Sequence, residues 1–491
     1  MTDPVIENSV RRRVAAVAAV RVAAVAAVAG CWWLLGSPGE LSAAKRPVVI
    51  GQRVQLLVDD HVIASRKGLT RRLGRVTKAN GGKPIFREGI FYGTVLYDQG
   101  RFKLWWRKRG KAGYGYSESR DGIRFTKRGD VSGINFAGDY TLTVMIDPHE
   151  TDPAHRYKAS YDAPGMAAGL AHSADGIRFT TYNGGKPVTT RAADTYNFLL
   201  WDGDAKTYRL FTRTDYAGAG GAGEWRGTRM MTNPDPKRHP TRWKTVRNWV
   251  FDREGKAERK RRQIYAVTDW MRHGVHFAIL SVYEWPGDFS EGGLDKHKRH
   301  ERDVMNYYIA TSRDADSWDL SWVYSSQPLV PRGPDGAFDK DLIIPASTIV
   351  THAGKHWIYY GGANERHGGP GFVVQRDQAV GLATIGEDRL VGLDASSRGT
   401  LVTRPFRLDG SRLLVNTKVR QGGSVRVAVL DRNGKTLEQF SSDNSRPITG
   451  DQAAAVVGWA GKAKLESLAG EVVQLRFEVS RASVYSFRIV K

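Results

Sequence analysis

A short motif recurs along the chain and constrains its fold more than any other feature. Residues 116–126 read Tyr-Ser-Glu-Ser-Arg-Asp-Gly-Ile-Arg-Phe-Thr, residues 170–180 repeat them closely, and residues 309–318 are a looser copy. The Ser-x-Asp-Gly core is a turn sequence, because Asp bonds nearby backbone N–H groups and Gly adopts a positive φ. Recurrence at long intervals indicates a fold assembled from similar units.

A paired-strand pattern precedes each copy, and most pairs are separated by a turn sequence, which indicates hairpins. These patterns cover residues 92–106, 140–161, 196–213, 264–283 and 342–360. The repeating unit is therefore four strands in roughly 55–80 residues, which is typical of a propeller blade. Five such units predict a five-bladed β-propeller over residues 51–395. A strand at residues 54–64 has no partner in its own blade, and we expect it to close the ring.

The repeat stops after residue 395, and apolar and polar residues then alternate in four further segments. These segments are residues 413–419, 423–430, 472–479 and 483–490. A hairpin turn, Asp431-Arg-Asn-Gly434, lies between two of them. Residues 396–491 are predicted to form a β-sandwich. The predicted fold class is thus all-β, with a five-bladed β-propeller followed by a β-sandwich domain.

The N-terminus has the features of an export signal. Three arginines at residues 11–13 precede an Ala/Val run, and Val28-Ala-Gly-Cys31 resembles a bacterial lipobox. Residues 1–31 are therefore predicted to be a signal peptide with Cys31 as the lipidation site, and residues 32–50 a tether. An uncleaved anchor is the alternative, because residues 14–35 are long enough to span a bilayer, although Arg21 disfavours it. Both interpretations predict that the folded part lies outside the cytoplasm, as a membrane-anchored lipoprotein or a secreted protein.

The chain is strongly basic, with 74 Lys and Arg against 51 Asp and Glu and a formal charge of +23. Eight basic residues and no acid lie between residues 61 and 87, and six more lie between residues 101 and 111. We expect Arg71, Arg72 and Arg107 to favour anionic glycans; a solvated basic face is the alternative. No helix-turn-helix, RNA-recognition or zinc-finger pattern accompanies the charge, so nucleic acid is not an expected partner.

The remaining composition limits cofactors and metals. A single cysteine excludes an internal disulfide framework and a cysteine-based zinc site. His297 and His300 lack carboxylate neighbours at metal-like spacing, so no metal site is predicted. No cofactor is expected, although a structural calcium in the channel remains open. The protein is expected to be a monomer.

Carboxylates recur near the predicted start of the first strand of each blade, where they converge on one mouth of the channel. They are Glu88, Asp139, Asp194, Asp269, Asp339 and Asp341. Glycoside hydrolysis needs one protonated and one ionised carboxylate, and crowding of like charges separates their pKa values. The predicted catalytic group is Glu88, Asp194 and Asp339. The predicted substrate-binding residues are Asp60, Asp139, Asn197, Asp269, Asp341, Trp270 and Tyr92.

Each catalytic residue has a predicted role. Asp194 is the ionised base or nucleophile, because Thr195 and Asn197 beside it can donate hydrogen bonds that favour the charged form. Glu88 is the acid, because burial by flanking Phe86 and Phe91 would raise its pKa. Asp339 would orient or tune the pair.

Several segments resemble a group of exported bacterial five-bladed propeller proteins related to glycoside hydrolase families 32 and 43. They are residues 55–63, 92–97, 117–122 and 194–197, and Phe338-Asp339 followed by residues 345–347. The resemblance covers about residues 50–491 and implies a three-carboxylate site and a C-terminal sandwich. The Trp-Met-Asn-Asp-Pro and Arg-Asp-Pro sequences of family 32 are absent, so fructan chemistry is not implied. Analogy with family 43 favours inversion at the sugar carbon.

Two functions follow from this reading. The first is an exported glycoside hydrolase that acts on a poly- or oligosaccharide. The second is a non-catalytic glycan-binding or cell-envelope scaffold protein. Acids that meet at one end of the channel would favour the enzyme, whereas a channel plugged by side chains would favour the scaffold.

Overall fold

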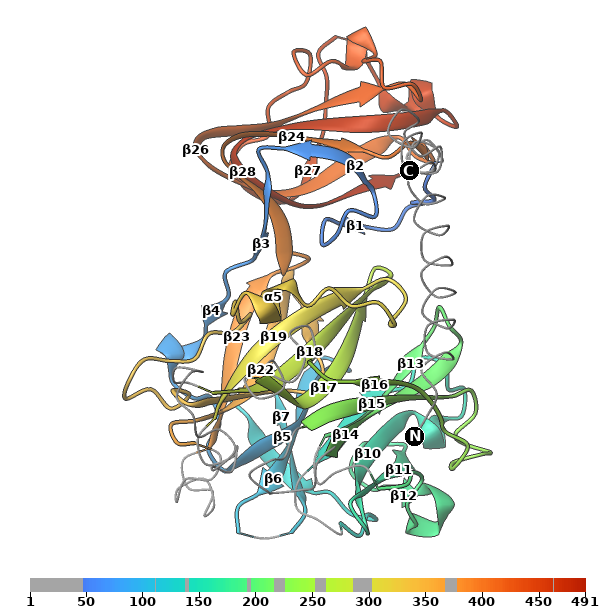
Figure 1. The fold of residues 1–491 in the computed structure, drawn as a ribbon, viewed down its shortest axis with the longest axis vertical. Helices are drawn as coiled ribbons and strands as arrows, with labels where there is room; N and C mark the ends of the chain where they lie inside the picture. Colours follow the sequence, from blue (N-terminus) through green and yellow to red (C-terminus); the bar gives the residue numbers. More distant parts are fainter. Residues whose placement is uncertain are drawn as a thin grey trace, which may run out of the picture.

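The fold consists of a lower lobe of several sheets and an upper lobe built mainly from the C-terminal part of the chain (Figure 1). The computed structural model describes residues 47–110, 112–136, 141–191, 196–215, 226–251, 262–285, 303–366, 378–461 and 463–491. Across these ranges, nearly all regular structure is β-strand, with a single α-helical turn, α5 (Ser321–Tyr324). No helix in the same ranges is long and apolar enough to cross a membrane. The predicted all-β class is confirmed.

Three separate four-stranded antiparallel sheets form the first part of the lower lobe. The first sheet contains β5 (Gly89–Asp98), β6 (Arg101–Lys108), β7 (Tyr114–Ser119) and β8 (Thr126–Asp130). The second contains β9 (Leu142–Ile146), β10 (Tyr157–Ala163), β11 (Ala167–Ser173) and β12 (Thr180–Thr181). The third contains β13 (Asn197–Asp202), β14 (Thr207–Asp215), β15 (Arg226–Asn233) and β16 (Lys244–Trp249). Each is one predicted blade.

The last two units are joined edge to edge into one larger sheet. The fourth unit contains β17 (Arg262–Arg272), β18 (Val275–Glu284) and β19 (Val304–Ser312). The fifth contains β20 (Leu342–Pro345), β21 (Val350–His352), β22 (Lys355–Ala363) and β23 (Ala379–Gly386), with β4 (Thr77–Lys78) on its edge. A single parallel pair, Met305 with Leu342, links β19 to β20.

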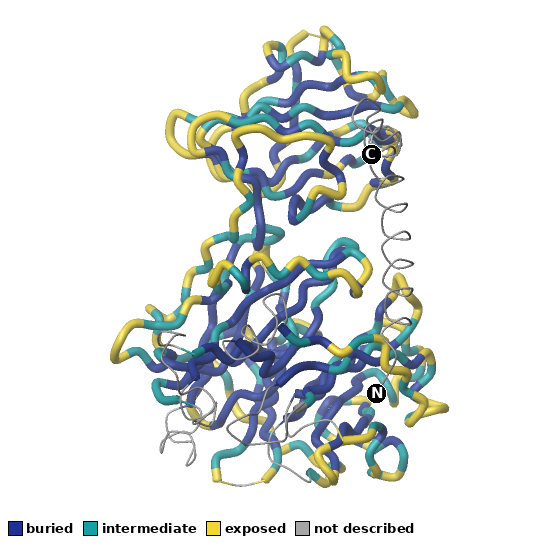
Figure 2. Tube along the Cα trace, in the orientation of Figure 1, coloured by how far each residue is buried: buried dark blue, intermediate teal, exposed yellow. Residues whose placement is uncertain are grey.

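The five units close into a ring. The first strands β5, β9, β13 and β17 contact one another in chain order, β20 contacts β18 and β19, and β20 also contacts β5. Buried backbone is concentrated in these central strands and in the middle of the upper lobe (Figure 2). The order of contacts is that of a five-bladed propeller.

The repeated motif forms the turn predicted for it, and the turns lock neighbouring blades together. The Asp121 carboxylate accepts N–H bonds from Ile123 and Arg124 at 2.9 and 2.8 Å, and Gly122 has a φ of +72°. The Tyr359 hydroxyl of the fifth blade donates to the Gly122 carbonyl at 2.9 Å. In the second copy, the carbonyl of the turn glycine Gly176 accepts a hydrogen bond from the indole N–H of Trp105 in the preceding blade.

The upper lobe is a sheet of long, irregular strands around its own core. Its main strands are β24 (Val391–Thr403), β26 (Arg412–Leu430), β27 (Asp451–Val456) and β28 (Val472–Val490), with β25 (Phe406–Arg407) on β28. Register shifts interrupt the pairing of β24 and of β26 with β28. The core includes Leu413, Val427, Phe440, Phe477 and Phe487, all at most 1% exposed.

The strand predicted to close the propeller belongs to the upper lobe, so that prediction is wrong. β1 (Gln55–Leu56) pairs with β28, while β2 (Ile63–Lys67) and β3 (Thr70–Leu73) pair with β24. The side chains of Leu57, Val62 and Leu69 are buried in the core of the upper lobe, which explains why these strands pair there and not with the propeller. The two-residue strand β4 pairs with β23 and completes the fifth blade instead.

Candidate functional site

Polar side chains are buried where the first strand of each blade begins and the second strand ends. Antiparallel pairing brings these ends to the same mouth of the propeller. The buried charged and amide side chains at this mouth include Arg107, Asp162, Asn197, Arg213, Arg226, Arg262, Gln263, Glu284, Asp303, Asp341 and Gln378. Buried charge is costly unless it is paired, so such a concentration marks a site rather than a core.

Asp162, at the end of β10, ties two blade entrances together. Its Oδ1 accepts hydrogen bonds from the Thr141 hydroxyl at 2.7 Å and the Asn197 side-chain amide at 2.9 Å. Its Oδ2 accepts the Thr141 N–H at 2.9 Å. The Tyr196 N–H in turn donates to the Thr141 hydroxyl at 3.2 Å. One carboxylate thus fixes the residues just before β9 and at the start of β13.

Four buried tyrosines form the floor of the mouth. The Tyr92 and Tyr265 hydroxyl oxygens are 3.2 Å apart, and the Tyr92 and Tyr196 rings are 5.7 Å apart. The Tyr265 and Tyr283 rings are 4.9 Å apart, edge to face. Burial, with the neighbouring tyrosines as a further cause, raises the pKa of Tyr92 well above its ordinary value. These rings fill the channel below the mouth, so a ligand would approach from the mouth side.

Two arginines stack on this floor. The Arg213 guanidinium carbon is 5.2 Å from the centre of the Tyr265 ring, and that of Arg226 is 5.0 Å from the centre of the Tyr283 ring. Burial raises the pKa of Tyr283 well above its ordinary value, the two arginines oppose that rise, and Asp303 adds to it. The phenol of Tyr283 therefore lies within electrostatic range of Arg213, Arg226 and Asp303. The low dielectric constant of the buried site strengthens these charge interactions.

Two other carboxylates at the mouth are engaged in structural contacts. Glu284 accepts a hydrogen bond from Arg262 at 2.6 Å and from the Tyr308 hydroxyl at 2.7 Å, and it also contacts the Asn306 amide. Asp341 pairs with the Arg366 guanidinium at 3.1 Å. Both carboxylates hold the entrances of the fourth and fifth blades in place.

The described parts of the chain contain no cluster of three or more His, Cys, Asp or Glu side chains arranged to hold a metal ion.

The predicted site residues divide into three groups. Asn197, Tyr92 and Asp341 lie at the mouth, although Tyr92 is buried in the floor and Asn197 binds Asp162. Asp139, Asp194 and Cys31 lie outside the described residues. Of the remaining predicted residues, Glu88 directly precedes β5 and so stands at the same end of its blade, and the others are at other positions in the structure.

Glu88 and Asp339 have surroundings different from those predicted. Glu88 is exposed, although Phe86 and Phe91 on either side of it are buried. The prediction that an apolar environment surrounds Glu88 is therefore wrong. Asp339 is buried, where it forms an ion pair with Lys78 at 2.6 Å and accepts a hydrogen bond from the Tyr360 hydroxyl at 2.9 Å. That pair attaches β4 to the fifth blade.

Three predicted substrate-binding residues lie away from the mouth. Asp60 precedes β2 in the upper lobe and pairs with Arg71 at 2.5 Å. Asp269 is in the far half of β17, where its carboxylate binds the His276 Nδ1 at 2.7 Å. The neighbouring Trp270 packs against Phe277. Asp60 was expected at the mouth because the 54–64 strand was assigned to the propeller. Asp269 and Trp270 lie seven and eight residues after the start of β17, too far along the strand to reach the mouth.

The basic residues predicted to favour anionic glycans lie in different parts of the structure. Arg71 and Arg72 lie on β3, beside the upper lobe, whereas Arg107 is 5% exposed at the propeller mouth. Lys103, in the second basic run, is buried and binds Asp98 at 2.7 Å and the Tyr157 hydroxyl at 2.8 Å. Much of the second run is therefore structural.

Asp162, Arg213, Arg226 and Asp303 were missed by the sequence analysis. The predicted acids stand near the start of each blade, whereas these four residues stand near the ends of strands or at or just before the start of later strands. Asp162 and Arg213 close the predicted hairpins 140–161 and 196–213, and antiparallel pairing places such residues beside the strand starts. A charged residue at the end of an apolar strand was the available signal.

No protein-family model matches the chain, and no curated protein matches it. Among solved structures, a thermostable family-43 glycoside hydrolase is 14% identical with a TM-score of 0.44, covering 62% of this chain and 92% of that one. A family-43 arabinoxylan arabinofuranohydrolase from Bacillus subtilis is 10% identical with a TM-score of 0.40, covering 85% and 99%. The Bombyx mori family-32 β-fructofuranosidase is 11% identical with a TM-score of 0.38, covering 83% and 94%. At this level of likeness, function has to be argued from the site itself.

Proposed function

We propose that the protein is a glycoside hydrolase that cleaves a poly- or oligosaccharide at the mouth of the propeller. The observation that carries the proposal is the Asp162 contact with Thr141 and Asn197. These two residues follow the predicted carboxylates Asp139 and Asp194 by two and three positions. Because Asp162 binds residues so close in sequence to Asp139 and Asp194, it supports the expectation that carboxylates from these two blades act together.

In this proposal, Asp194 and Asp303 are the reacting pair. Asp194 keeps its predicted role as the ionised base or nucleophile. Asp303 replaces Glu88 as the proposed acid, because it is a buried carboxylate within electrostatic range of Tyr283 at the mouth, whereas Glu88 is exposed. Asp162 is a positioning residue. The acid would protonate the leaving oxygen while the ionised carboxylate acts on water or on the sugar carbon.

A non-catalytic glycan-binding scaffold is the second candidate, and the tyrosine floor favours it. Tyr92, Tyr196, Tyr265 and Tyr283 fill the channel, and arginines stack on two of them. A mouth whose channel is closed by buried side chains can bind a sugar without hydrolysing it. Turnover is the property that separates the two functions.

The experiment is a screen of the full chain against arrayed neutral and anionic polysaccharides, with released reducing ends measured. On any substrate found, Asp194→Asn and Asp303→Asn should each lower turnover by about 100-fold or more. Asp443→Asn, at an exposed position of the upper lobe, is the matched control and should leave turnover unchanged. Binding without release of sugars from any polysaccharide would favour the scaffold.

We further propose that the protein is exported and lipidated at Cys31, as the Val-Ala-Gly-Cys sequence suggests. Its substrate would then be an extracytoplasmic glycan.

A further inference from the structure

A large groove lies between the two lobes, on the side of the propeller opposite the mouth. Its volume is about 740 Å³, within the range of small-ligand sites. The strand β22 runs from Lys355, which lines the groove, to Ala363 beside the mouth, so roughly 25 Å separates the two places. The groove is therefore distinct from the proposed hydrolytic site.

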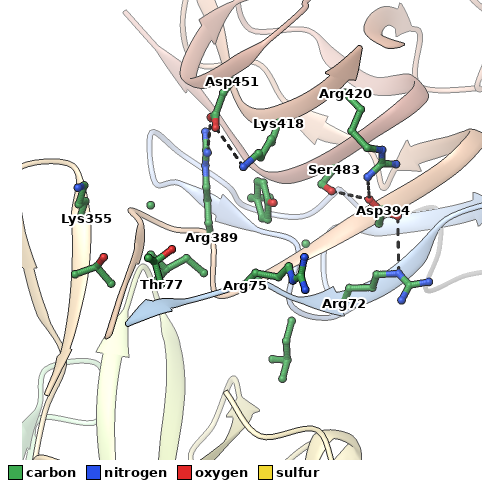
Figure 3. Close-up of a pocket in the computed structure, with 17 residues that line it drawn as sticks. Arg72, Arg75, Thr77, Lys355, Arg389, Asp394, Lys418, Arg420, Asp451 and Ser483 are labelled. Carbon is green, nitrogen blue, oxygen red and sulfur yellow. Dashed lines mark hydrogen bonds and ion pairs between the residues drawn. The ribbon is translucent and has the colours of Figure 1, made fainter. Parts of the chain in front are cut away.

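Both lobes contribute basic side chains to this groove. The lining residues include six basic side chains and only two carboxylates: Arg72, Arg75, Lys355, Arg389, Lys418, Arg420, Asp394 and Asp451. Figure 3 shows Arg72 and Arg75 on the segment that leads to the propeller, facing Lys418 and Arg420 of the upper lobe. Positive charge in a concave site attracts anions more strongly than the same charge on a flat surface.

The two carboxylates neutralise only part of this charge. Asp394 accepts hydrogen bonds from Arg420 and from the Ser483 hydroxyl, both at 2.7 Å. Asp451 binds Arg389 and lies 3.7 Å from Lys418. Arg75 and Lys355 are exposed, and neither side chain has a hydrogen bond or ion pair to another described residue. Arg72 and Lys418 also keep 64% and 61% of their side chains exposed.

The chemistry of the groove favours an anionic sugar chain over other polyanions. Single-stranded nucleic acid is held by aromatic platforms on which bases stack. The groove has one aromatic side chain, Tyr485, and the Arg389 guanidinium carbon already lies 5.3 Å from the centre of its ring. A membrane surface would need a flat or convex basic face, whereas this site is a cavity between two lobes. Hydroxyl-rich sugars with acidic groups match guanidinium, ammonium and Ser483 hydroxyl donors.

We infer that this interdomain groove binds an oligosaccharide bearing carboxylate or sulfate groups. Such a site would hold a distant part of a long anionic glycan while another part of the same chain lies at the propeller mouth. Its binding function does not depend on hydrolysis.

The test compares two double charge reversals in the full chain. Arg75→Glu with Lys355→Glu alters the groove at the two basic residues that lack structural partners. Arg432→Glu with Lys435→Glu is the matched control, because both residues are exposed in the 431–435 turn and the change in net charge is the same. Calorimetric titrations use a galacturonate tetramer, a heparin-derived tetrasaccharide, cellotetraose and oligothymidylate.

We expect at least one anionic tetramer to bind, and the tetramer that binds more tightly identifies the preferred acidic group. The groove reversal should weaken that binding by about tenfold or more, and the control by less than about twofold. Binding should also fall with salt, since the Debye length drops from about 10 Å at 0.1 M to about 3 Å at 1 M. Equal losses in both variants, equal binding of cellotetraose, or tighter binding of oligothymidylate would overturn the inference. Asp194→Asn should bind the tetramer normally, so a failure of hydrolysis leaves this test unaffected.

Discussion

Replacement of Asp162 by Asn tests whether one carboxylate holds two blade entrances together. The Asp162 carboxylate only accepts, and it receives the Thr141 N–H, the Thr141 hydroxyl and the Asn197 amide at 2.7–2.9 Å. Residue 162 is only 3% exposed, so water cannot replace a lost partner there. An asparagine amide would therefore have to direct its NH₂ group at one of these donors. At least one buried donor would therefore lose its partner.

The expected cost follows from the number and kind of these contacts. A hydrogen bond to a charged group contributes about 1.5–3 kcal/mol, and a buried donor without a partner costs about 1–3 kcal/mol. Because the other donors can still reach the remaining oxygen, we expect Asp162→Asn to lower the free energy of unfolding by about 2–4 kcal/mol. In a lobe of this size, that loss corresponds to a fall in Tm of about 4–8 °C.

Scanning calorimetry of the two-lobed chain resolves this change without assuming a two-state transition. The matched control is Asp121→Asn, whose carboxylate also accepts several hydrogen bonds but lies in an exposed turn that asparagine tolerates. The control should shift the Tm by no more than about 2 °C. If Asp162→Asn leaves the Tm unchanged, or shifts it no more than Asp121→Asn does, the anchoring role is wrong.

Three further results are expected. Burial alone would raise the pKa of Asp388, but hydrogen bonds from His273 at 3.0 Å and Arg272 at 2.8 Å hold it well below its usual range. Its contribution to stability is thus present above pH about 4 and lost as the pH falls further, so the Tm of Asp388→Asn should differ less between pH 7 and pH 3 than that of the unaltered protein. Gly176→Ala should cost more than about 1 kcal/mol in urea unfolding, because Gly176 has a φ of +77° and a Cβ there would lie 2.9 Å from Trp105. Cys31→Ala should abolish incorporation of radiolabelled fatty acid and release the protein from membranes; unchanged labelling would contradict the lipobox interpretation.

The repeating unit could be predicted from sequence because its signals are local. Asp121 and Gly122 form their turn through contacts within four residues, so the motif alone determines the conformation. The partner of an isolated strand depends on contacts distant in sequence. The sequence predicts a strand at residues 54–64, but only the apolar core of the upper lobe, more than 300 residues later, determines where this part of the chain pairs.

The site was only partly predictable for a related reason. Asn197 and Asp341 were found because they stand at strand starts. Glu88 was misjudged because burial of its neighbours Phe86 and Phe91 was assumed to extend to it, whereas its own side chain is exposed. Buried arginines such as Arg213 carry no distinctive local pattern, since only the assembled mouth reveals that their charge is enclosed.

The central claim is that carboxylates at the propeller mouth hydrolyse a glycosidic bond, and single-turnover kinetics of Asp194→Asn test it most directly. With saturating enzyme and a fluorescent oligosaccharide cut from the best substrate of the screen, the rate of bond cleavage is measured free of product release. We predict that Asp194→Asn lowers this rate by about 100-fold or more while the substrate still binds and the Tm stays within about 2 °C of the unaltered protein. A rate close to that of the unaltered protein would show that the mouth is not where the bond is broken.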